Sequence, residues 1–150
     1  MIRFTALTLF GLSLIALASE ARTDEVAEEL KLLQGDWVPA SAELAGQKLP
    51  EEVLKTMKLT VKDDKYVVVA ASTNDEGSLK LDIAAKPKTM DIVGTSGPSK
   101  GKTIPAIYEL SADSLRVCYG LEGASRPTEF KSQPVDKGLI LLITYKRPGK

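Results

Sequence analysis

The sequence predicts an all-β protein, an eight-stranded antiparallel up-and-down barrel with one N-terminal helix. Three observations lead to this fold class. About eight short segments alternate between apolar and polar residues or are rich in β-branched residues, which is typical of strands. The connections between most of them are shorter than the dozen or so residues that a parallel crossover needs. Closure removes the exposed edges of such a sheet. A two-sheet sandwich is the alternative arrangement.

The N-terminal segment, residues 1–21, is typical of a secretory signal peptide. Arg3 is followed by an apolar run that reaches Ala18, and this run is shorter than the ~20 apolar residues of a membrane-spanning helix. Pairs of small residues predict cleavage after Ala18 or after Ala21. We therefore expect an exported protein, periplasmic or extracellular, whose mature domain comprises residues 22–150 without stable membrane insertion. A retained anchor is the alternative.

The composition excludes several classes of function. The 150 residues include 20 Lys+Arg and 20 Asp+Glu, no His and one Cys. A net charge of zero argues against a nucleic-acid partner. Without His, neither imidazole catalysis nor the usual His/Cys zinc site is available. We therefore expect no enzyme activity, no metal and no cofactor. The single thiol, Cys118, is expected to be a small buried hydrophobe.

The first element of the mature chain is predicted to be a helix that begins at Thr23, a residue able to cap it. Val26, Leu30 and Leu33 then follow at helical spacing and form one apolar stripe. Gly35 is expected to end the helix. Because the stripe must pack on something larger, we expect the helix either to cover the outer face of the last strand or to plug one end of the barrel.

The remaining elements are predicted to be strands, with one short helical turn at residues 50–55. Pro39 predicts an edge or a bulge in the first strand. Residues 72–77 and 94–102 are interpreted as polar turns and loops, and residues 120–134 as a long loop. The predicted strands span residues 37–44, 58–61, 66–70, 79–83, 90–93, 103–110, 115–119 and 138–146.

Alternation along the strands predicts an apolar interior that contains phenol groups. Tyr108 and Tyr119 are the tentative ligand-binding residues inside it. Arg126, in the long loop, is interpreted either as an anchor for a carboxylate or phosphate at the barrel mouth or as a structural contact with Glu129 or Trp37 that pins the loop. The side chains expected to face inward are Leu79, Leu81, Ile83, Tyr108, Leu110, Leu115, Val117 and Tyr119.

Other candidate motifs favour structural roles. The adjacent acid pairs at residues 28–29, 51–52 and 63–64 do not face each other as a general acid/base dyad would. The segment at residues 97–103 is rich in Gly and Lys. It lacks the spacing of a phosphate-binding loop and precedes a strand rather than a helix.

The segment that joins the helix to the first strand contains Gly35 and Trp37 as a Gly-x-Trp motif, which resembles the signature of lipocalins and their barrel relatives. This resemblance implies that Trp37 closes the barrel bottom and that a basic residue after the last strand, Lys146 or Arg147, lies across its ring. Further strings resemble a family of small, uncharacterised, mostly exported domains of planctomycete bacteria. The resemblance implies a lipocalin-like barrel and no established activity. The strings occur in order at residues 32–37, 46–50, 58–61, 86–92, 97–103, 107–110, 115–118 and 126–130.

The sequence thus predicts an exported, non-enzymatic, lipocalin-like binding module for a small apolar or amphipathic ligand. The alternative is a structural or protein-interaction domain with a filled barrel core that acts through its loops. The two differ in whether the barrel holds a cavity.

Overall fold

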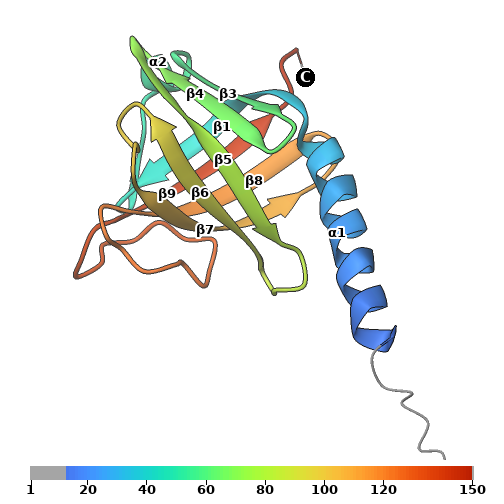
Figure 1. The fold of residues 1–150 in the computed structure, drawn as a ribbon. Helices are drawn as coiled ribbons and strands as arrows, with labels where there is room; N and C mark the ends of the chain where they lie inside the picture. Colours follow the sequence, from blue (N-terminus) through green and yellow to red (C-terminus); the bar gives the residue numbers. More distant parts are fainter. Residues whose placement is uncertain (1–12, 150) are drawn as a thin grey trace, which may run out of the picture.

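The computed structural model describes residues 13–149 and shows a closed antiparallel barrel preceded by one helix (Figure 1). Helices and strands follow the chain in the order α1 (Ser13–Leu33), β1 (Gly35–Leu44), β2 (Gln47–Lys48), α2 (Glu51–Leu54), β3 (Met57–Lys62), β4 (Lys65–Ala70), β5 (Thr73–Asp82), β6 (Lys88–Ser96), β7 (Thr103–Leu110), β8 (Ser114–Leu121) and β9 (Leu139–Lys146).

The barrel is built from eight long strands in up-and-down order. Each strand from β3 to β8 pairs antiparallel with the next, and β1 pairs with both β3 and β9. The pairing of β1 with β9 closes the sheet, which confirms the predicted barrel and excludes the sandwich. The short β2 pairs only with the end of β1.

Several strands are longer than their local sequence predicts. The interpretation of residues 72–77 as a turn is wrong, because β5 begins at Thr73 and the turn before it is short. Ala71 provides this turn with a φ of 55°. Likewise, β6 runs on to Ser96, and it ends inside the segment expected to be a loop. In both cases a neighbouring strand supplies partners for backbone N–H and C=O groups, and this pairing outweighs weak local β-propensity.

Two proline positions match their predictions. The register of β1 against β9 shifts between Pro39 and Ser41, which confirms the predicted bulge. Pro50 directly precedes the short helix α2, as the predicted helical turn requires.

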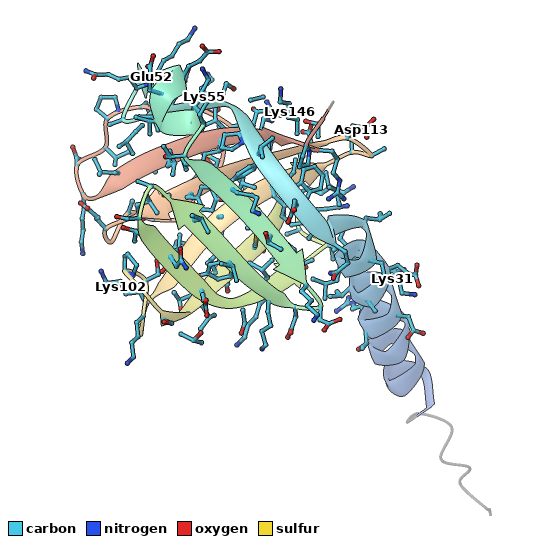
Figure 2. The ribbon with its side chains drawn as sticks, turned by 90° about the horizontal axis from the view of Figure 1, so that it is seen from above. Lys31, Glu52, Lys55, Lys102, Asp113 and Lys146 are labelled. Atoms are coloured by element: carbon cyan, nitrogen blue, oxygen red, sulfur yellow. The ribbon has the colours of Figure 1, made fainter. Side chains whose placement is uncertain are left out.

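The barrel has two dissimilar ends. The helix end contains the β3–β4, β5–β6 and β7–β8 turns and the end of β9 at Lys146. The end of α1 meets the first of these turns, where the Gln34 side chain forms hydrogen bonds with the Asp63 backbone. At the far end lie α2, the β6–β7 connection (residues 97–102) and the β8–β9 loop (residues 122–138). Figure 2 shows Lys102 projecting outward on the side away from the helix. Because the sheet is closed, side chains outside the barrel can approach its interior only from one of these two ends.

Helix α1 plugs the helix end through its last turn. Leu33 is fully buried and Leu30 packs against the same core. The helix begins at Ser13, so the prediction that Thr23 starts and caps it is wrong; the Leu- and Ala-rich sequence before Thr23 continues the helix. Its N-terminal part projects away from the barrel (Figure 1). Within residues 13–149, we find no helix of the length and apolarity required to cross a membrane.

The outer face of β9 is covered by the β8–β9 loop and not by the helix, contrary to the first of the two expected arrangements. Ile107, Cys118 and Ile140 form a buried cluster on this face, over which Ala124 and Phe130 fold from the loop. Burial raises the pKa of the Cys118 thiol, as expected for a small buried hydrophobe. A second core therefore lies outside the barrel wall.

Candidate functional site

The interior of the barrel contains a cavity of about 180 Å³. Its walls are aliphatic side chains from β3 to β9. Leu33 of the helix lines it from the helix end, and Ser99 of the β6–β7 connection lines it as well. The cavity is therefore part of the main core and is separate from the outer cluster.

Two phenols meet within this cavity. The Tyr119 and Tyr145 hydroxyl oxygens are 3.0 Å apart and share one hydrogen bond. Burial raises the pKa of Tyr145 to about 12 and that of Tyr119 well above its usual value, so both are neutral near pH 7. Each hydroxyl has one hydrogen to donate. Because the pair uses one, a second hydrogen is left for a water or a ligand oxygen, as no other partner exists among the described residues.

A carboxylate completes the polar lining. Asp75 lies on the inner face of β5, where one oxygen accepts a hydrogen bond from the Tyr66 hydroxyl at 2.9 Å and the other from the Ser99 N–H at 2.8 Å. Tyr66 lies opposite Gly77 across the β4–β5 ladder. A Cβ at Gly77 would lie 2.8 Å from the Tyr66 ring. The glycine therefore gives the ring room to extend along the barrel wall to Asp75.

Tyr108 and Tyr119, both expected in the interior, have different surroundings. Tyr119 lines the cavity. Tyr108 is buried, and its hydroxyl donates to the Glu29 carboxylate of α1 at 3.0 Å, which also accepts from the Lys88 ammonium at 2.8 Å. Burial and this carboxylate raise the Tyr108 pKa. Tyr108 thus ties the helix to the barrel and is not among the cavity-lining side chains.

Other residues expected to face inward divide similarly. Leu79, Leu115 and Val117 are buried in the main core. Leu81 and Leu110 are partly buried against it. Ile83 lies beyond the end of β5 and outside that core, so its predicted place in a strand is wrong.

The Arg126 side chain lies outside the cavity. Its guanidinium pairs with the Asp91 carboxylate on the outer face of β6 and donates to the Ala106 carbonyl at 2.9 Å. It also borders a hollow of about 360 Å³ formed largely by the exposed β8–β9 loop. These contacts match the loop-pinning interpretation of Arg126, but the expected partners are wrong. Its partner is Asp91, whereas Glu129 pairs with Lys131 and Trp37 stacks with Arg147.

The Gly-x-Trp signature closes the helix end. Trp37 is fully buried and donates its indole N–H to the Leu33 carbonyl at 2.9 Å. The Arg147 guanidinium lies 3.6 Å from the ring centroid and donates to the Leu32 carbonyl at 2.9 Å. Gly35 has a φ of +99°, and a Cβ there would lie 3.3 Å from Arg147. Of the two basic candidates, Arg147 is thus the one that stacks on the tryptophan.

Sequence reasoning missed three titratable residues that line the cavity: Tyr66, Asp75 and Tyr145. Asp75 was hidden because its surroundings contain turn-forming residues. A signal was nevertheless present, since counting back in twos from the inward-facing Leu79 reaches Gly77 and then Asp75.

Comparison of the chain with family models, with curated proteins and with solved structures gives no match in any of the three. The geometry itself is compatible with a lipocalin-like fold. The features that support this likeness are the closed eight-stranded antiparallel barrel and the stack of Arg147 on Trp37 beside the end of α1.

Proposed function

We propose that the protein is a binding module that holds one small apolar or amphipathic molecule inside the barrel. The observation that carries this proposal is the interior cavity of about 180 Å³ with its mainly aliphatic walls. Apolar cavities of about 150 Å³ bind molecules the size of benzene. The space here therefore suits a ligand with roughly seven or eight non-hydrogen atoms. The free hydroxyl hydrogen of the Tyr119–Tyr145 pair offers such a ligand one donor.

Export and the lack of catalysis belong to the same proposal. Export is supported by the signal-like segment at residues 1–21, and a non-enzymatic role by a sequence without His. The ordered sequence strings likewise support kinship with the exported planctomycete domains. An exported binding barrel would act as a carrier or sensor.

The filled-core alternative is less well supported. It calls for an exposed apolar patch on the loops. Among residues 22–149 the large exposed apolar side chains are Leu32, Val53 and Val135, and each belongs to a different segment. Phe130 of the β8–β9 loop instead packs against the outer cluster.

A pair of substitutions on one strand tests the proposal. Val68 on β4 lines the cavity, whereas its neighbour Val69 faces the opposite side of the sheet. Val68→Phe fills the cavity, and Val69→Phe makes the same chemical change outside it. Binding of toluene and benzyl alcohol is measured by thermal shift and by NMR titration.

We expect both probes to stabilise the wild-type protein and Val69→Phe, because ligand binding to the folded state alone raises the unfolding temperature. Val68→Phe should lose this response. A wild-type protein that responds to neither probe at millimolar concentration, or a Val68→Phe variant that responds fully, would overturn the proposal. Mass spectrometry of the protein from its own host's envelope then identifies the natural occupant.

A further inference from the structure

The cavity contains one carboxylate that pairs with no cation among the described residues. Among the described side chains that line it, Asp75 is the only charged one. None of the ion pairs within residues 22–149 includes Asp75. A carboxylate next to aliphatic walls loses part of its hydration, so an unpaired charge there is unfavourable.

The contacts of Asp75 within the protein do not account for this charge. Its two partners, the Tyr66 hydroxyl and the Ser99 N–H, are both neutral donors. An ionised carboxylate has about four acceptor positions, of which these bonds use two. The two donors therefore fix the orientation of the carboxylate and leave acceptor capacity free.

A ligand that pairs with this carboxylate must combine two properties. It needs one compact positive charge with hydrogen-bond donors, which an ammonium group supplies. It also needs a small apolar body that fits beside Leu79 and Ile92, two of the aliphatic residues in the wall. Charge-assisted hydrogen bonds are roughly twice as strong as neutral ones, so the ammonium group should dominate the choice of ligand.

We propose that Asp75 binds the ammonium group of a small primary monoamine whose hydrocarbon part occupies the barrel cavity. This inference rests on the proposed function and specifies the chemical class of the ligand. The Tyr66 hydroxyl and the Ser99 backbone N–H position the carboxylate, and the aliphatic walls hold the body of the amine.

Benzylamine and benzyl alcohol form a matched test pair, because they share one skeleton and differ in the ammonium or hydroxyl group. Binding to the wild-type protein is measured by calorimetry at neutral pH. We expect the amine to bind about tenfold more tightly or better, equivalent to about 1.4 kcal/mol. In Asp75→Asn the preference should fall to about twofold or less while alcohol binding persists. The matched control is Glu76→Gln, which removes an exposed charge from the next position of β5 and should keep the preference.

A second measurement does not depend on a variant. In NMR titrations of the wild-type protein, the amine should shift the Ser99 amide signal more than the alcohol does, because that N–H donates to Asp75. Equal binding of amine and alcohol would overturn the inference and leave the proposed function standing. A preference that survives in Asp75→Asn would also overturn it. Failure of both compounds to bind would refute the proposed function itself.

Discussion

Removal of the Arg147 side chain should be one of the most destabilising changes at the barrel surface. Its guanidinium stacks on Trp37 with 3.6 Å to the ring centroid. It also donates to the Gln34 and Leu32 carbonyls at 2.7 and 2.9 Å. These carbonyls belong to the end of α1, where backbone acceptors lack helical partners. Arg147 therefore joins the helix end to the barrel.

The size of the effect follows from these contacts. A cation–π contact contributes about 0.5–2 kcal/mol, and a hydrogen bond that involves a charged group about 1.5–3 kcal/mol. Because Arg147 is only partly buried, values near the lower limits apply. We expect Arg147→Ala to lower the free energy of unfolding by about 2–4 kcal/mol. Arg147→Lys should retain less than half of this stabilisation, because an ammonium lacks the planar set of N–H donors of a guanidinium.

Urea unfolding followed by the fluorescence of Trp37, the only tryptophan, measures the effect, with circular dichroism as a second probe. Lys146→Ala is the matched control because Lys146 is exposed and is not one of the cations that stack on a ring in the described part of the chain. It should change stability by less than about 0.5 kcal/mol. If Arg147→Ala lowers the free energy of unfolding by less than about 1 kcal/mol, or by no more than Lys146→Ala does, the stabilising role assigned to the ring stack and the carbonyl hydrogen bonds is refuted.

Three further outcomes follow from buried groups. Burial raises the pKa of all four tyrosines, that of Tyr145 to about 12. The free energy of unfolding should therefore stay constant up to about pH 10, which is the pKa of tyrosine in the unfolded chain, and should decrease as the pH rises through 12. Tyrosinate absorbance should appear only as the barrel unfolds. Cys118 should react with a thiol reagent only as fast as the region opens, because it is fully buried and its pKa is raised; rapid labelling of the native protein would contradict this. Arg126→Ala should release the β8–β9 loop and speed its proteolysis, whereas Asp91→Asn should do so less, because the carbonyl contact of Arg126 remains.

Local sequence patterns were sufficient to predict the barrel and the seal at its helix end. Alternating apolar residues and short turns are local signals, and they left antiparallel pairing as the available arrangement. The Gly-x-Trp motif and the basic residues after the last strand gave the resemblance from which the stack on Trp37 was expected. These features depend on residue type and spacing along the chain. They were therefore visible without coordinates.

The polar groups that share the interior are brought together only by the folded chain. Alternation tells which face a side chain occupies, but not which side chains of different strands meet there. Asp75 meets Tyr66 across a glycine, and Arg126 reaches Asp91 outside the barrel, because closure and loop folding bring distant segments together. Strand ends such as Thr73 were likewise set by backbone pairing with a neighbour. Such contacts are long-range, and no local pattern encodes them.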